Sequence, residues 1–332
     1  MNERCHIYRK EKWIMKIVVL ESKSVGDDVT FSAFEKFGEV ELYPQTSKEE
    51  MVARSRDADV LIANKLPFCE ETLKEAKNLK LVCLTATGFN NLDGEYLKKR
   101  GIAAYNVAGY STEGVAQHTF ALLLYLYEKL RYYDDFVKSG SYIGCGMFSY
   151  FGVAFNELKD KTWGILGLGA IGRKVAEIAS AFGCKVICCS ASGKIYDSPY
   201  EQVSFDELLK RSDVLSVHAP LNAYTNQIMN KGAFAKMKSS AIFLNLARGL
   251  IVNEQDLADA LNNGEIAAAG LDVLAEEPMN PDNPLLNIQD SQKLFITPHI
   301  GWAATETRKR CVDEVCKNIR RFLDGDLTNR IY

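Results

Sequence analysis

Three short stretches in the last third of the chain each carry a side chain that could take part in chemistry on a carbonyl acid. Arg248 lies in the run NLARG, Glu277 precedes a proline, and His299 follows a Thr-Pro pair. A histidine titrates near neutral pH and can donate a proton, a carboxylate can tune that donor, and an arginine can hold an acidic substrate. Together the three side-chain types match the needs of a carbonyl reduction beside a nicotinamide.

Each of these residues alone also has an ordinary structural interpretation. His299 could make a structural contact at a strand end, Arg248 could form a loop ion pair, and Glu277 could lie in a solvated turn. The remaining histidines fit the role of proton donor less well by their positions in the chain: His6, His118 and His218. The chemical interpretation therefore depends on the elements that would bring the three motifs together.

One such element is a short apolar strand, residues 162–166, that runs into a glycine-rich turn and then a helix. Gly167, Gly169 and Gly172 give the spacing G-x-G-x-x-G. In this context one glycine permits a tight turn, one lets the backbone approach a pyrophosphate, and one allows close packing of helix on strand. The helix would point free N–H groups at an anion. The pattern predicts dinucleotide binding, although a glycine-rich turn without a ligand would have the same letters.

The rest of the chain alternates apolar runs with helical patterns, which predicts an α/β fold with two doubly wound parallel sheets. In the first part we expect strands over 17–20, 40–43, 60–63, 79–85 and 102–106, with helices over 31–37, 48–56, 70–76 and 92–100. In the second part, after the glycine-rich turn, we expect strands over 185–189, 214–218, 241–246, 266–273 and 294–297, with helices over 205–210, 231–237 and 254–261. One long amphipathic helix, 112–138, should link the parts, and a helix over 305–323 should end the chain with no strand after it. This organisation predicts a cleft between two domains.

The composition excludes several classes of protein. A length of 332 residues with 47% hydrophobic content is enough for about two domains with sizeable cores. The formal net charge is -3 and no long basic run occurs, so the charge pattern of a nucleic-acid binder is missing. Nine scattered cysteines without a C-x-x-C spacing argue against a disulfide framework and against a metal site. We expect reduced thiols and a cytoplasmic protein.

Neither a membrane segment nor a signal peptide is expected. No apolar run is long enough to span a bilayer, and the first residues are polar and mixed in charge. Residues 1–14 therefore look like a leader that is not part of the fold. Structure should begin at Met15.

The choice between the two nicotinamide dinucleotides should depend on the end of the second strand after the turn. An acidic residue about 20 positions past the fingerprint normally binds the adenosine ribose and repels a 2′-phosphate. Ser190 stands at that place, followed by Ser192 and Lys194. The repulsion that excludes NADP is absent, so either NAD or NADP could bind.

At this point the motifs match a known family. From about Met15 to Leu323 the chain resembles the D-isomer-specific 2-hydroxyacid dehydrogenases, and NLARG, the Glu-Pro turn and Thr-Pro-His are similar to that family's catalytic motifs. The resemblance implies that Arg248, Glu277 and His299 are catalytic. The run STEGVAQH from Ser111 and the pair Gly301-Trp302 resemble most the glycerate dehydrogenase or hydroxypyruvate reductase branch. Two departures are Ser190 in place of the usual Asp and Gly114 where a serine is common.

The resemblance also implies a set of binding residues. Thr87 and Gly88, in a loop at the carboxyl end of an expected strand, match the substrate-carboxylate loop, with Arg248 and Trp302 as further substrate contacts. Contacts to the cofactor beyond the three glycines are implied for Thr112, Ala170, Ile171, Ser190, His218, Ala219, Pro220, Leu246, Ala247, Arg248 and Asp272.

The same resemblance implies a discontinuous domain arrangement and an activity. Residues 15–110 plus 299–332 would form the substrate domain, and residues 111–298 would bind the dinucleotide and mediate a homodimer. Hydride from NADH or NADPH would reduce a small 2-keto acid while His299 protonates its oxygen. Two alternatives are a dinucleotide-sensing binding protein of the corepressor type and a dehydrogenase for formate or a phosphorylated hydroxy acid.

Overall fold

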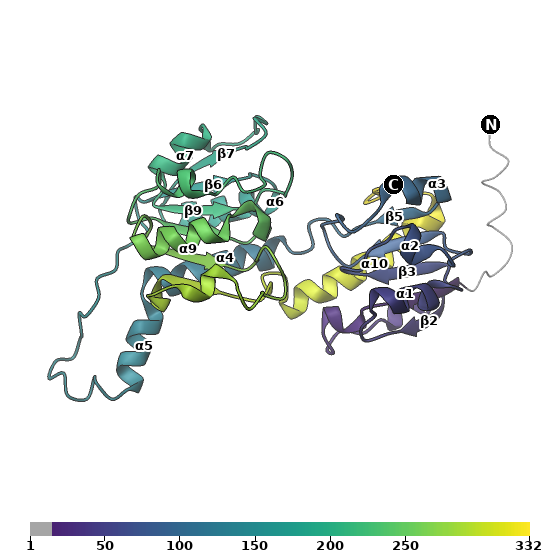
Figure 1. The fold of residues 1–332 in the computed structure, drawn as a ribbon, viewed down its shortest axis with the longest axis horizontal. Coiled ribbons are helices and arrows are strands. Elements are labelled where there is room, and N and C mark those ends of the chain that lie inside the picture. Colours follow the sequence, from purple (N-terminus) through teal and green to yellow (C-terminus); the bar gives the residue numbers. More distant parts are fainter. Residues whose placement is uncertain (1–14) are drawn as a thin grey trace. The chain divides into compact units, whose positions relative to one another are not determined.

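The structure is a computed structural model that describes residues 15–332, and these residues form two compact units (Figure 1). The first unit contains residues 15–110 together with Ala303–Tyr332, and the second contains Ser111–Trp302. The expected leader, residues 1–14, lies outside the described residues. Each unit is built on its own all-parallel sheet, which confirms the predicted α/β class.

The sheet of the first unit has five strands in the order β2-β1-β3-β4-β5. Their bounds are β1 Met15–Val19, β2 Gly38–Leu42, β3 Val60–Ala63, β4 Leu81–Leu84 and β5 Ala103–Tyr105. The helices of this unit are α1 Lys48–Ser55, α2 Glu70–Leu73, α3 Gly94–Arg100 and α10 Thr305–Asp324. β3 and β4 are buried along their whole length, as expected of parallel strands covered on both faces.

The helix expected over residues 31–37 is wrong, because only a short 3-10 helix, Ser32–Phe34, forms there. Phe31, Phe34 and Phe37 are all buried, and hydrogen bonds three residues apart join them in series. A spacing of three places side chains on one line in a 3-10 turn, which has three residues per turn. The aromatic spacing therefore fits the tighter helix.

The chain returns to the first unit at its end, where α10 lies alongside the sheet (Figure 1). Val315 and Ile319 of this helix are fully buried. Beyond it, Arg330 forms an antiparallel bridge with Tyr105, and Ile331 N–H donates to the Ala104 carbonyl at 2.8 Å. No strand follows α10, as expected, but this tail still covers the edge of β5 that would otherwise be unpaired.

The sheet of the second unit has seven strands in the order β12-β11-β10-β9-β6-β7-β8. Their bounds are β6 Thr162–Leu166, β7 Lys185–Cys189, β8 Glu201–Gln202, β9 Val214–Val217, β10 Ile242–Asn245, β11 Ala268–Leu271 and β12 Leu294–Ile296. The helices after β6 are α6 Ala170–Ala181, α7 Phe205–Arg211, α8 Lys231–Phe234 and α9 Glu254–Asn263. The strand order reverses direction between β6 and β9, and open α/β sheets bind ligands at such a point.

The single helix expected over residues 112–138 is also wrong, because the structure breaks it into α4 (Thr112–Tyr127) and α5 (Leu130–Lys138). Lys129 adopts a left-handed backbone with φ 57°, a conformation that ends helices. The side chains of Leu122 and Leu126 in α4 pack closely over Gly270, each with an atom 3.3 Å from where a Cβ would lie. α5 buries none of its residues, so nothing in the unit's core keeps it in line with α4.

The second unit extends to Trp302, four residues beyond the expected domain boundary at residue 298. The N–H groups of Ile300 and Gly301 both donate to the carboxylate of Asp272, at 2.8 Å each. These bonds hold residues 299–302 on the second unit. Among the described helices, none combines the length and apolar character needed to cross a bilayer.

Candidate active site

The three predicted catalytic residues follow three neighbouring strands of the second unit. Arg248 follows β10, Glu277 follows β11 and His299 follows β12, and these strands are adjacent and parallel. Carboxyl ends of parallel strands lie at the same edge of a sheet, so the three loops lie at one edge. His299 Nδ1 lies 2.7 Å from Glu277 Oε2, so the structure brings the predicted pair together.

Both members of this pair are fixed by the backbone around them. Leu274 N–H donates to the second Glu277 oxygen at 3.0 Å. His299 has a left-handed backbone with φ 56°, and its N–H donates to the Thr297 carbonyl at 2.9 Å. Because Nδ1 is engaged by the carboxylate, Nε2 is the ring nitrogen that can exchange a proton with a substrate. The His299 side chain keeps 26% of its surface accessible, which permits that exchange.

The Arg248 loop is held by Asn245, a fully buried residue at the end of β10. The Asn245 side chain accepts from Ala247 N–H at 3.1 Å and donates to the Arg248 carbonyl at 3.0 Å. Gly249 then packs directly on the backbone of Leu274, where a Cβ would lie 1.9 Å from the carbonyl carbon. The Arg248 loop therefore lies against the loop that carries Glu277. Two predicted cofactor contacts in this loop, Leu246 and Ala247, are mostly buried.

Asp272, at the end of β11, anchors the loop that carries His299. Its Oδ1 accepts from the Thr297 hydroxyl at 2.6 Å and from Ile300 N–H, and its Oδ2 accepts from Gly301 N–H. Burial raises the pKa of Asp272, but hydrogen bonds from His118, Thr297 and the two N–H groups outweigh it and leave the pKa below its usual value. The carboxylate is thus charged at neutral pH and holds the chain on both sides of His299. Its expected contact with the cofactor stays a prediction.

His118 is part of this anchor, although its position within a helix had made it a weak candidate. Its Nε2 lies 2.9 Å from the Thr297 hydroxyl and 3.4 Å from Asp272 Oδ1. The Thr297 hydroxyl uses its single proton to donate to Asp272, so His118 Nε2 must be the donor to Thr297. No local sequence pattern predicts this contact, because His118 and Thr297 are 179 residues apart in the chain.

The glycine-rich turn has the shape that a dinucleotide needs. Gly167 has φ 96° and packs on the backbone of Ala219, and a Cβ on Gly172 would lie 2.2 Å from the Gly167 carbonyl oxygen. Gly169, the residue before α6, has nothing within 4 Å of its Cβ position and is exposed, as is Ala170. Backbone N–H groups in the first turn of α6 have no partner within the helix, so this open space suits a pyrophosphate.

Two further loops flank this turn. His218 N–H donates to the Leu166 carbonyl at 2.8 Å, while both ring nitrogens are buried without a hydrogen-bond partner among the described residues. Burial lowers the pKa of His218 to about 3, so its ring is neutral and has an unused donor. Buried polar atoms normally have partners, and these two fit a site completed by a ligand. Pro220, two residues on, is exposed.

The loop after β7 begins with Ser190, and residues 190–194 carry no acidic side chain. The Ser190 hydroxyl lies 3.2 Å from that of Ser192 and accepts from Lys194 N–H at 3.0 Å. Gly193 has φ 74° and allows the chain to fold back over these hydroxyls. The loop therefore offers two hydroxyls and a lysine side chain at the place where an acid would exclude a 2′-phosphate.

The remaining predicted contacts lie in separate places. Thr112 begins α4, and Trp302 is the half-buried last residue of the second unit. Thr87 and Gly88 lie in the first unit, in the loop after β4, and the structure describes each unit by itself. In that unit the switch point between β1 and β3 is filled by Glu21, whose Oε2 accepts from the N–H groups of residues 64–66. These three backbone donors are already engaged by Glu21, so the loop after β4 is the better candidate for a second anion.

Comparison with known proteins places this geometry in a family. A family model described as "D-isomer specific 2-hydroxyacid dehydrogenase, NAD binding domain" matches residues 120–301. The hydroxypyruvate reductase of Blautia hydrogenotrophica is 39% identical over 95% of this chain and 99% of its own length. The glycerate dehydrogenase of Methylorubrum extorquens is 33% identical over 95% of this chain and 98% of its own. A solved acyclic imino acid reductase in complex with NADPH and D-Arg is similar with a TM-score of 0.84, at 30% identity, over 96% of this chain and 100% of that one.

Proposed function

Because this chain belongs to the D-isomer specific 2-hydroxyacid dehydrogenase family, we propose that it reduces small 2-keto acids of the glyoxylate and hydroxypyruvate type. As a member it is an NAD(P)-dependent oxidoreductase that acts on the CH–OH group of 2-hydroxy acids. The observation that carries the proposal is the 2.7 Å pair of His299 and Glu277, one strand away from the Arg248 loop. The names of the two relatives favour a substrate with a short side chain.

The chain's own residues supply the acid chemistry of this reaction. When bound, the reduced nicotinamide supplies a hydride to the keto carbon. His299, protonated at Nε2, gives its proton to the keto oxygen, and Glu277 stabilises the charged ring before that transfer. Arg248 holds the substrate carboxylate through its planar guanidinium. The product is a 2-hydroxy acid, and the neutral His299 then regains a proton from water.

We propose that the fingerprint turn holds the cofactor. Gly167, Gly169 and Gly172 shape the turn, and the N–H groups of Ala170 and Ile171 would bind the pyrophosphate. The open space at Gly169 and the unpartnered His218 ring support this assignment. In the first unit, the loop with Thr87 and Gly88 is proposed to bind the substrate carboxylate, and Trp302 to contact the substrate.

We propose that NADPH binds at least as well as NADH. The support is the loop after β7, where Ser190 replaces a carboxylate and Ser192 and Lys194 can bind a 2′-phosphate. The similar imino acid reductase was solved with NADPH, which agrees with this preference without deciding it.

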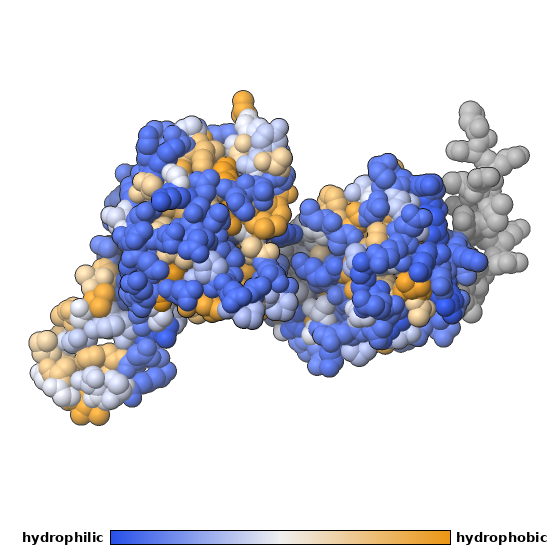
Figure 2. Space-filling view, in the orientation of Figure 1, coloured by the Kyte–Doolittle hydropathy of each residue, from blue (hydrophilic) through white to orange (hydrophobic). Residues whose placement is uncertain are grey.

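We also propose a homodimer formed through an arm, defined as residues 130–157. The arm carries α5 and a following segment in which Ile143, Phe148 and Phe151 each expose 86% or more of their surface. Figure 2 shows orange and pale residues gathered over the arm. Exposed apolar patches of this kind mark protein interfaces, and a second copy would cover them.

The eight described cysteines are all free, which is typical of a reducing compartment, so we propose a cytoplasmic location.

Steady-state assays with a panel of keto acids test the proposed function. Glyoxylate, hydroxypyruvate, pyruvate and a bulkier 2-keto acid are each offered with NADPH and with NADH. We expect the highest kcat/KM for glyoxylate or hydroxypyruvate with NADPH. Cofactor binding without turnover of any 2-keto acid would contradict the proposal and favour a dinucleotide-sensing binding protein.

A further inference from the structure

Around Thr87, the loop after β4 is hydrogen-bonded to the segment that directly follows β5. The Asn106 side chain donates from Nδ2 to the Thr87 carbonyl at 2.6 Å. The Thr87 hydroxyl donates to the Val107 carbonyl at 2.8 Å, and Val107 N–H donates to the Ala86 carbonyl at 3.0 Å. Residues 106 and 107, directly after β5, therefore hold the loop by three hydrogen bonds. The bond from Asn106 fixes the Thr87 backbone through a side chain.

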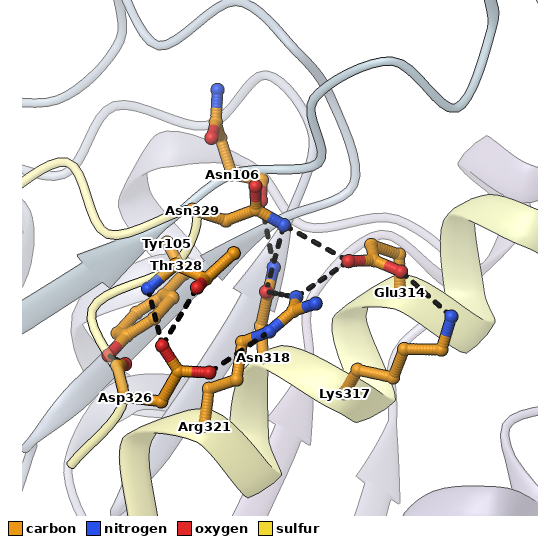
Figure 3. A network of polar contacts seen from close by, with 9 residues as sticks. All are labelled: Tyr105, Asn106, Glu314, Lys317, Asn318, Arg321, Asp326, Thr328 and Asn329. Carbon is orange, nitrogen blue, oxygen red and sulfur yellow. Dashed lines mark hydrogen bonds and ion pairs between the residues drawn. The ribbon is translucent and has the colours of Figure 1, made fainter.

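The backbone of Asn106 is itself held by the C-terminal part of the chain. Asn318, a fully buried residue of α10, donates to the Asn106 carbonyl at 2.8 Å. Asn106 N–H donates to the Asn329 carbonyl at 3.3 Å. Figure 3 shows Asn318 and Asn329 meeting below Asn106, whose amide points away from them. The backbone of Asn106 thus faces the C-terminal network while its side chain is free to serve the loop.

Several hydrogen bonds that involve the charged groups of Arg321 and Glu314 hold this network together. Arg321 donates to Asn318 Oδ1 at 2.7 Å and to Glu314 Oε1 at 2.6 Å, and Asn329 donates to the same Glu314 oxygen at 3.1 Å. Hydrogen bonds that involve a charged partner are roughly twice as strong as neutral ones. The C-terminal tail also reaches the loop beyond Gly88, since the ring of Tyr332 packs edge-on against Phe89 at 6.4 Å.

We propose that Asn106 is a positioning residue for the substrate carboxylate, which it serves by fixing the Thr87 backbone on a support built from the C-terminal segment. The inference rests on the proposed function, in which Thr87 and Gly88 bind the substrate carboxylate. If Asn106 had only a structural role, replacing its side chain would change the stability of the fold. Its side chain bonds to the Thr87 loop and not to the C-terminal network, so replacing it should change the affinity for the substrate.

The test compares two variants at this position with a matched control in the same unit. Asn106→Asp keeps the shape, removes the Nδ2 donor and adds a negative charge, whereas Asn106→Ser removes the bond without a charge. Asn78→Asp adds the same charge at an exposed site of the first unit. We expect KM for glyoxylate or hydroxypyruvate to rise roughly tenfold or more in Asn106→Asp and by about threefold to tenfold in Asn106→Ser. The Asn78 variant should stay within about twofold of the parent.

Three further readings separate this inference from others. NADPH affinity by fluorescence and kcat should stay within about threefold of the parent, and the melting temperature should show that the variants are folded. An unchanged KM in a folded Asn106→Ser variant of an active parent would overturn the inference. A fall in kcat and NADPH affinity equal to the rise in KM would also overturn it, since that pattern marks general damage. A parent that turns over no keto acid would instead contradict the proposed function.

Discussion

At the scale of single residues, the proposed role of Glu277 is to act on the reaction through His299. Its Oε2 holds Nδ1 of that ring at 2.7 Å, and its second oxygen is held by Leu274 N–H. We expect Glu277→Gln, which keeps the shape and removes the charge, to lower the reductive rate by roughly 10- to 100-fold, less than loss of the proton donor itself. A reductive rate equal to that of the parent, measured at the same pH and saturating NADPH, would show that Glu277 does not act through His299.

The side chain at position 190 should decide between the two cofactors. We expect Ser190→Asp to weaken NADPH binding by roughly tenfold or more through repulsion of the 2′-phosphate, and to change NADH binding by less than about threefold. Ser190→Ala, which adds no charge, is the matched control and should keep most of the NADPH affinity. Fluorescence titration of both cofactors measures the effect. If Ser190→Asp lowered the affinities for NADH and NADPH equally, the 2′-phosphate would not bind next to position 190.

Residues that belong to short sequence motifs could be predicted from the sequence. Gly167 and Gly172 have the spacing of a known turn motif. His299 and Glu277 follow two strands that apolar runs predict, so we expected these two side chains to lie at one edge of the sheet. The anchor of the His299 loop could not be predicted. His118 and Thr297 are 179 residues apart, and only packing of α4 on the sheet brings them together.

At the scale of elements, the loop after β12 depends on the Asp272 carboxylate. We expect Asp272→Asn to destabilise the second unit by about 1–3 kcal/mol at pH 7, because an amide cannot accept as many hydrogen bonds and adds an unmatched donor. Urea unfolding followed by tryptophan fluorescence measures this difference, since Trp163 and Trp302 both lie in the second unit. Asp282→Asn, at an exposed site of the same unit, is the matched control.

The same carboxylate predicts a pH dependence of stability. Because the pKa of Asp272 is lower in the folded chain than its usual value of about 3.9, its contribution is present above pH 4 and is lost as the pH falls through the folded pKa. The difference in unfolding free energy between the parent and Asp272→Asn should therefore shrink below pH 4. A difference that stays constant down to pH 3 would contradict the assignment of a charged, hydrogen-bonded Asp272.

Strands could be predicted better than helix ends, for a physical reason. β3 matches the expected run because a buried parallel strand needs an unbroken apolar sequence. The break at Lys129 could not be predicted, since lysine is a good helix former and nothing in its residue type indicates the left-handed backbone found there. The turn at Phe31–Phe37 likewise has apolar residues at a spacing that either kind of helix can use.

At the scale of the whole molecule, the arm of residues 130–157 makes the chain's oligomeric state testable. We expect Phe148→Asp combined with Phe151→Asp to convert a dimer to a monomer in size-exclusion chromatography with light scattering, because the two charges would be buried at the interface. Tyr224→Asp, at another exposed aromatic residue of the second unit, should leave the dimer intact. A monomeric parent, or a dimer that survives both charges, would contradict the proposed role of the arm.

The measurement that tests the central claim most directly is the rate of NADPH-dependent reduction of hydroxypyruvate by the parent, His299→Ala and Ile300→Ala. Ile300 is an exposed neighbour in the same loop and serves as the control for disturbance of the backbone. We predict that His299→Ala lowers kcat by roughly 100- to 10,000-fold, the usual contribution of a general acid, while NADPH affinity stays nearly unchanged. Ile300→Ala should stay within about threefold of the parent. A His299→Ala variant that reduces hydroxypyruvate at nearly the parent's rate would contradict the account.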